Sequence, residues 1–266
     1  MDDIKNAVID DPRVIQEIDK DYVHEELYSG MPVVWIEKKQ WKIPTNRNQD
    51  GSFSCVKQSS ATAIEVLTKN VISAGTYQLR SNAPSGGMWL QNCGDIDYKQ
   101  GFVFESLVPS QDMSDPVMDA ITLPVLTSKI SGYRTFNELN VEKVAEAIQA
   151  YGNCILTFGI GSGEWRQTPV YLGTEISFNH AICGVDFALI DGVKTIICMD
   201  SAGKGNAPDG VRNITEDYMD KRGKDAMYYL GIKKATPILE QQIPQGEWDK
   251  FMAFIRAWKS LFGFTK

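Results

Sequence analysis

The segment around Cys55 combines residue types that suit nucleophilic catalysis. Its apolar periodicity predicts a helix from about Cys55 to Ala74, with Ser54 as the N-cap. A cysteine in the first turn of a helix lies at the positive end of the helix dipole, which favours the thiolate form. On the preceding loop, the carboxamide of Gln49 could join the backbone N–H of Cys55 in donating hydrogen bonds to an oxyanion. These residue types predict a thiol nucleophile with an oxyanion site beside it.

A base for this thiol must be His24 or His180, because the chain has only two histidines. His24 lies in an acidic stretch and is interpreted as a surface residue. His180 follows Cys55 by 125 residues and begins a predicted strand, and Asp200 ends the next one. Neighbouring antiparallel strands could place Asp200 against the imidazole, which completes a nucleophile, a base and an orienting group.

Each of these residues alone has a simpler interpretation. A lone cysteine before a helix is usually a buried structural residue, and a lone histidine at a strand start is usually part of a core or an edge. Asp200 alone reads as a turn residue and Gln49 as a loop residue. Their joint order favours chemistry, because a separation of roughly 130–150 residues between nucleophile and partners is typical of one group of cysteine proteases.

The chain resembles the papain-like cysteine peptidases. That family has a Gln, a nucleophilic Cys opening a helix, a His-Ala pair and an Asn-Ser pair. Here Gln49, Cys55, His180-Ala181 and Asp200-Ser201 stand in those places in order. The resemblance extends over roughly residues 31–232.

The resemblance implies a fold, a reaction and a set of site residues. The fold is α+β, with a helical lobe, a lobe of antiparallel sheet and the active-site cleft between them. The reaction is hydrolysis of a peptide or protein substrate through a thioester on a cysteine, without a metal or an organic cofactor. The implied catalytic residues are Cys55, His180, Asp200 and Gln49, and the implied substrate-binding residues are Gly86, Gly87 and Asn179.

The sequence departs from the family pattern in four places. Ser52 stands where a cysteine usually precedes the nucleophile, so the family disulfide of that lobe cannot form. Val56 and Ala202 replace two aromatic residues, and the ring missing at Ala202 usually shields the third catalytic group from water. Asp200 replaces the usual Asn, so an Asp200→Asn substitution is expected to retain substantial activity.

The elements that must position these residues change in character along the chain. The first half is helix-like and loop-rich, with a short helix expected near 88–99 and an amphipathic helix over 140–151. The second half has short apolar runs separated by turn residues, which predicts an antiparallel sheet. The expected divisions are an N-terminal helical extension over 1–30, a peptidase domain over 31–236 with lobes at about 31–140 and 141–236, and a C-terminal linker and amphipathic helix over 237–266.

Composition excludes several other classes of protein. A hydrophobic content of 43% in 266 residues is typical of a globular chain. A net charge of −7 disfavours nucleic-acid binding, which needs a basic face. No apolar run is long enough to span a membrane, and the acidic N-terminus has no apolar signal region. Five scattered cysteines disfavour a disulfide framework, so a cytoplasmic location is expected, with a virion or assembly-associated location as the alternative.

Two other functions remain open. The first is an amidase or cell-wall peptide hydrolase, which uses a related Cys–His pair. The second is a non-catalytic component of a larger assembly, suggested by the lost aromatic residues and by an aromatic stripe over 246–262 that could mediate self-association or bind an assembly partner.

Overall fold

The computed structural model describes residues 32–49, 52–75, 87–110, 128–161, 163–166, 169–173, 175–202 and 210–233. The chain divides into two compact units, Met1–Lys233 and Lys234–Lys266. The expected extension over 1–30, which contains His24, and the C-terminal segment over 237–266 lie outside the described residues. The domain boundaries proposed from the sequence therefore stay a prediction.

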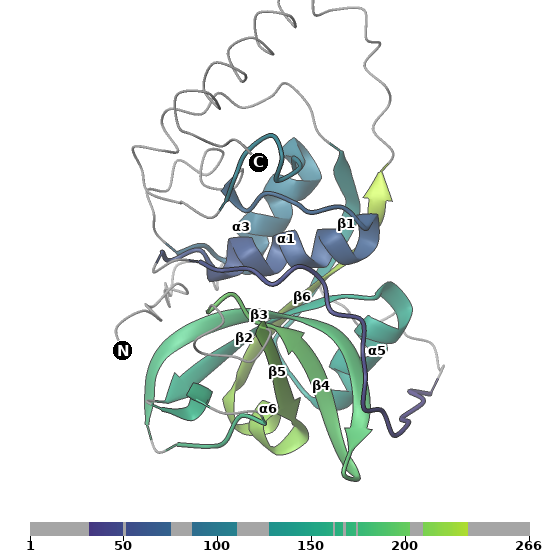
Figure 1. The fold of residues 1–266 in the computed structure, drawn as a ribbon, viewed down its shortest axis with the longest axis vertical. Helices are drawn as coiled ribbons and strands as arrows, with labels where there is room; N and C mark the ends of the chain where they lie inside the picture. The colour runs from purple at the N-terminus through teal and green to yellow at the C-terminus, as the bar shows by residue number, and fades with distance from the viewer. Residues whose placement is uncertain are drawn as a thin grey trace, which may run out of the picture. The chain divides into compact units, whose positions relative to one another are not determined.

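The described elements confirm an α+β fold (Figure 1). The longest of the described helices precedes all the strands along the chain. The helices are α1 (Cys55–Thr68), α3 (Leu90–Asp95), the π-helix η3 (Ile96–Gln100), α5 (Val141–Tyr151), the 3₁₀ turn η4 (Glu164–Arg166) and α6 (Glu216–Arg222). The strands are β1 (Lys129–Phe136), β2 (Cys154–Gly161), β3 (Ile176–Ile190), β4 (Val193–Met199), β5 (Val211–Thr215) and β6 (Gly223–Lys233).

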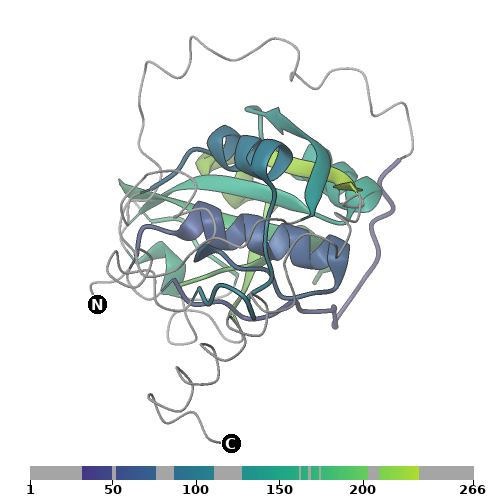
Figure 2. The same ribbon diagram turned by 90° about the horizontal axis from the view of Figure 1, so that it is seen from above.

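One antiparallel sheet contains all of these strands, in the order β1-β6-β2-β3-β4-β5. Its central strands separate two apolar cores, because successive side chains of a strand point to opposite faces. On β3, Cys183 packs in the core of α1 and α3, whereas Ile182 packs in the core of α5 and α6. Figure 2 shows α1 and α3 beside the sheet, and α1 contacts both β3 and α3. The central strands thus connect the two lobes.

Helix α1 is shorter than the sequence predicted. Its first three turns, Cys55 to Glu65, are buried on every face, so the polar positions of the pattern lie in the interior as well as the apolar ones. It ends at Thr68, because Lys69 adopts a left-handed conformation with φ of 62° and donates its backbone N–H to the carbonyl of Glu65. Ile72 lies beyond this end and forms a β-bridge with Phe104. The apolar periodicity therefore continues past the end of the helix.

Strand β1 lies in a region that the sequence predicted to be loop-rich. Its buried residues Ile130 and Tyr133 are three positions apart, whereas a regular strand buries every second residue. The irregularity comes from register shifts on both sides of Gly132, where β1 pairs with β6. The shifts remove the alternation by which such a strand is recognised in a sequence.

The described part of the chain contains no helix with the length and hydropathy of a membrane span. All five cysteines lie among the described residues, and each is free and buried.

Candidate active site

Helix α1 begins at Cys55, as the sequence predicted, and the thiol is fully buried. The side chain of Ser54 does not cap the helix and instead lies 2.7 Å from the hydroxyl of Ser52. The first backbone N–H groups of a helix lack intrahelical partners and attract negative charge. Cys55 therefore lies where an oxyanion or a thiolate is stabilised by the backbone.

Gln49 reaches the same place along the segment 32–49. This segment is fixed to the sheet near its start by two backbone hydrogen bonds to Leu189, and at its end by a 2.8 Å bond from the backbone N–H of Gln49 to the carbonyl of Ser201. The Gln49 side chain accepts a hydrogen bond from the Ser201 hydroxyl at 2.9 Å and donates one to the carbonyl of Ser52 at 2.9 Å. The amide nitrogen of Gln49 carries a second hydrogen for a further acceptor.

His180 and Asp200 meet as the strand argument predicted. His180 lies on β3 and Asp200 directly follows β4, and the two strands are paired. The Nε2 atom of His180 lies 2.8 Å from Oδ1 of Asp200, and both side chains are fully buried. The other ring nitrogen, Nδ1, is buried and forms no hydrogen bond of ordinary geometry within the described part of the chain. Nδ1 is therefore the atom left to exchange a proton with a neighbouring thiol.

Trp165 and Arg212 complete the surroundings of Asp200, and neither was predicted from the sequence. Trp165 donates its indole N–H to Oδ2 of Asp200 at 2.6 Å, and Arg212 donates Nε–H to the same oxygen at 2.9 Å. The Trp165 ring also meets the His180 ring edge-on, with centroids 5.8 Å apart. Trp165, which lies in the connection after β2, thus covers the His180–Asp200 pair. Ala202, which follows β4, has no ring to do so.

The electrostatics of the pair favour a charged imidazole. Burial alone would lower the pKa of His180, but the charge and hydrogen bond of Asp200, with a smaller contribution from Cys55, raise it to about 10. Burial alone would raise the pKa of Asp200, but His180 and Arg212 hold it well below its usual range. Near neutral pH the site therefore contains an imidazolium and a carboxylate, with the Cys55 thiol close enough to act on the ring.

This coupling predicts a pH dependence of stability. The His180 pKa rises from 6.5 in the unfolded chain to about 10 in the folded one, so its stabilisation is fully present below pH 6.5 and lost as the pH rises through 10. At about 1.4 kcal/mol per pKa unit, we expect the free energy of unfolding to fall by at most roughly 5 kcal/mol across that range. Urea unfolding measures this fall, and a His180→Gln variant should show a clearly smaller one. Equal falls in the two proteins would contradict the attribution of this pH dependence to the raised pKa of His180.

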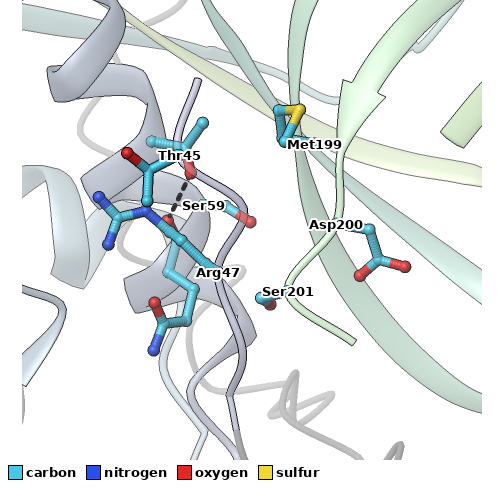
Figure 3. Close-up of a pocket in the computed structure, with 8 residues that line it drawn as sticks. Thr45, Arg47, Ser59, Met199, Asp200 and Ser201 are labelled. Atoms are coloured by element: carbon cyan, nitrogen blue, oxygen red, sulfur yellow. Dashed lines mark hydrogen bonds between the residues drawn. The ribbon is translucent and has the colours of Figure 1, made fainter. Parts of the chain in front are cut away.

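Figure 3 shows where the segment 32–49 and α1 face the end of β4. Thr45 and Arg47 lie on one side of a narrow crevice, and the carboxylate of Asp200 points away from them. Arg47 is instead paired with Glu65 at 2.9 Å, and both side chains are almost fully buried. Two buried arginines therefore lie near Asp200, and only Arg212 is paired with it.

The structure gives less information about the three residues assigned to substrate binding, Gly86, Gly87 and Asn179. Asn179 precedes His180 on β3, is half-buried and pairs with Gly159 of β2. Gly87 is half-buried just before α3, and Gly86 lies outside the described residues. Their assignment stays a prediction. Within the described ranges, no group of three or more His, Cys, Asp or Glu residues is arranged to hold a metal ion.

No protein-family model matches the sequence, and no curated protein matches it. Solved structures do match. Digestive procathepsin L 3 from the larval midgut of Tenebrio molitor has a TM-score of 0.64 at 16% identity, over 79% of this chain and 74% of its own. Digestive procathepsin L2 from the same tissue has a TM-score of 0.61 at 17% identity, over 70% of this chain. The match spans 64% of that procathepsin L2 chain, slightly less than two thirds of its length.

A bacterial enzyme extends the likeness beyond the insect proteins. Xylellain, a cysteine protease from Xylella fastidiosa, has a TM-score of 0.61 at 15% identity, over 72% of this chain and 85% of its own. Identities this low report on the fold alone. The arrangement of helices and sheet, together with these likenesses, shows that the chain has the two-lobe α+β fold of the papain-like cysteine proteases.

Proposed function

We propose that this protein is a cysteine-type peptidase that hydrolyses peptide bonds through an acyl-enzyme on Cys55. The observation that carries the proposal is the buried His180 ring, bonded to Asp200 through Nε2 and influenced by Cys55. The raised pKa of His180 supports an imidazolium–thiolate pair with Cys55, which is the reactive form of a thiol nucleophile.

In the proposed reaction, the Cys55 thiolate attacks the carbonyl carbon of a peptide bond. The backbone N–H of Cys55 and the second amide hydrogen of Gln49 stabilise the oxyanion, with each such donor typically contributing about 2.7–4 kcal/mol. His180 then gives its Nδ1 proton to the leaving amine, and a thioester remains on Cys55. Water, deprotonated by His180, hydrolyses the thioester and restores the thiol.

Asp200 has the role of orienting group in this scheme. Its Oδ1 accepts the hydrogen on Nε2 of His180, which fixes the tautomer and leaves Nδ1 to face the thiol. The Trp165 ring excludes water from one edge of the imidazole. This ring also weakens one ground for a non-catalytic role, the loss of the aromatic residue at Ala202, because the third group is covered by Trp165.

Casein and peptidoglycan, tested side by side, separate the proposed activity from its nearest alternative. We expect the protein in reducing buffer to release peptides from casein, and we expect a thiol-alkylating reagent to stop the release. Release from peptidoglycan alone would indicate the cell-wall hydrolase. No release from either substrate by the folded protein would favour the non-catalytic component.

A further inference from the structure

We propose that Arg212 is a positioning residue for the His180–Asp200 pair, and that through Arg212 this site requires a carboxylate at position 200. This inference rests on the proposed function for its kinetic consequences, but its structural consequences can be measured on the folded protein alone. It concerns Oδ2 of Asp200, the oxygen that faces away from His180.

Four hydrogen-bond contacts surround the carboxylate of Asp200. Oδ1 lies 2.8 Å from Nε2 of His180 and accepts the backbone N–H of Ala202 at 2.9 Å. Oδ2 accepts from Trp165 at 2.6 Å and from Arg212 at 2.9 Å. Two contacts on each oxygen use the full acceptor capacity of a carboxylate. An asparagine would place an NH₂ group either against the donors of Arg212 and Trp165, or against the backbone N–H of Ala202 and the Nε2 atom of His180, which carries a hydrogen in the imidazolium.

Arg212 and Asp200 form a buried ion pair. The side chains of Arg212 and Asp200 are both fully buried, and Asp200 is the only ion-pair partner of Arg212 among the described residues. A guanidinium keeps its charge inside proteins, so a buried arginine needs an anion. The nearby carboxylate of Glu164 is already bound by Arg222 and by the hydroxyl of Tyr218.

Arg212 and Trp165 lie against each other beside Oδ2 of Asp200. The guanidinium carbon of Arg212 lies 5.4 Å from the centroid of the Trp165 ring, whose N–H points to the same Asp200 oxygen. Arg212 and Trp165 therefore hold Oδ2 from two directions. With Oδ2 fixed, Oδ1 remains directed at His180.

These contacts reverse the expectation that Asp200→Asn is mild. The variant would leave the Arg212 charge buried without an anion, and it would set the new NH₂ group against the donors of Arg212 and Trp165. We expect Asp200→Asn to lower Tm by roughly 10 °C and turnover by about 10²-fold or more.

A second substitution should relieve the damage if Arg212 is its cause. In Asp200→Asn/Arg212→Gln, the buried charge is gone and the Gln carbonyl can accept from the Asn amide. We expect the double variant to recover roughly half or more of the lost Tm and about tenfold or more of the lost turnover. Arg134→Gln is the matched control. Arg134 is a half-buried arginine on β1 that donates to the carbonyl of Tyr133, so this change should rescue nothing in the Asp200→Asn background.

The pH profile of Cys55 alkylation tests whether the carboxylate at position 200 sets the pKa of His180. Among the described residues, the titratable groups that shift the pKa of His180 are Asp200 and Cys55. Arg212 affects the ring only through its hydrogen bond to Asp200. Without the carboxylate, the pKa of His180 falls, so the alkaline limb of alkylation in the double variant should move to lower pH by about one unit or more. An unmoved limb in a folded double variant would show that the carboxylate does not hold up the pKa of His180, and would contradict the requirement for a carboxylate at position 200.

Stability and activity separate failure of this inference from failure of the proposed function. Wild-type Tm and turnover in Asp200→Asn would overturn the inference, and so would a double variant that is no better folded than Asp200→Asn. If the wild-type protein hydrolyses nothing but Tm follows the expected cycle, the proposed function fails while the Arg212 requirement stands.

Discussion

Replacing Cys55 by alanine is expected to abolish peptide hydrolysis and leave the fold intact. The substitution removes one sulfur atom from the first turn of α1, and among the described residues Cys55 is the thiol that acts on His180, so no other thiol there could form the proposed thioester. Turnover of a fluorogenic peptide should fall to the background rate, and the circular dichroism spectrum should not change.

Cys93 provides the matched control for this change. It is a fully buried thiol of α3, in the same core as Cys55, and burial raises its pKa. Cys93→Ala therefore removes the same atom at similar depth and should keep activity. If Cys55→Ala turned over the peptide at a rate close to that of Cys93→Ala, the assignment of Cys55 as the nucleophile would be wrong.

Replacing His180 by glutamine should be nearly as severe. Glutamine can still bond Asp200, but it cannot take a proton from Cys55 or return one to the leaving amine. Because general acid–base catalysis contributes about 10²–10⁴-fold, we expect kcat/KM to fall by that factor or more. The measurement is steady-state kinetics with the same peptide, at a pH where the wild-type protein is fully active.

A matched variant separates this loss from damage to the sheet. Asn179→Ala changes the neighbouring residue of β3, which does not belong to the proposed proton-transfer pair. It should retain far more activity than His180→Gln, with any effect mainly on KM. Equal losses in the two variants would show that disruption of β3, and not proton transfer, explains the result.

The order of Gln49, Cys55, His180 and Asp200 along the chain was enough to predict the candidate site. Cys55 begins α1, His180 lies within β3 and Asp200 directly follows β4, and the local sequence pattern indicates each of these elements. Gln49 lies on the loop before α1 and was predicted from its position relative to Cys55. Trp165 gave no such signal. It lies in a short 3₁₀ turn after β2, and its contacts with Asp200 depend on how that connection folds back over the sheet.

Arg212 could not be predicted for a similar reason. It lies on β5, a five-residue strand with a charged and an amide side chain near its centre, which lacks the apolar run of the strands that the sequence predicted. Its role follows only from the pairing of β5 with β4. In this pairing Arg212 lies opposite Cys198, two residues before Asp200, and its side chain reaches the Asp200 carboxylate. A residue that is charged and yet fully buried is recognised in three dimensions, not in a sequence.

We propose that Cys55 reacts as a nucleophile through its pairing with His180, and selective alkylation tests this proposal most directly. The other four cysteines, Cys93, Cys154, Cys183 and Cys198, are fully buried, and burial raises the pKa of each, to about 12 for Cys183. They should stay protonated and react slowly. Cys55 is also buried, so the measurement shows at the same time whether a ligand can reach it.

The folded protein is treated with a limiting amount of a peptidyl epoxide, and the labelled cysteine is identified by mass spectrometry of its peptides. The account predicts that Cys55 is labelled first, at least about tenfold faster than any other cysteine, and that His180→Gln removes this preference. Labelling of Cys55 no faster than that of Cys93, or unchanged selectivity in His180→Gln, would contradict it.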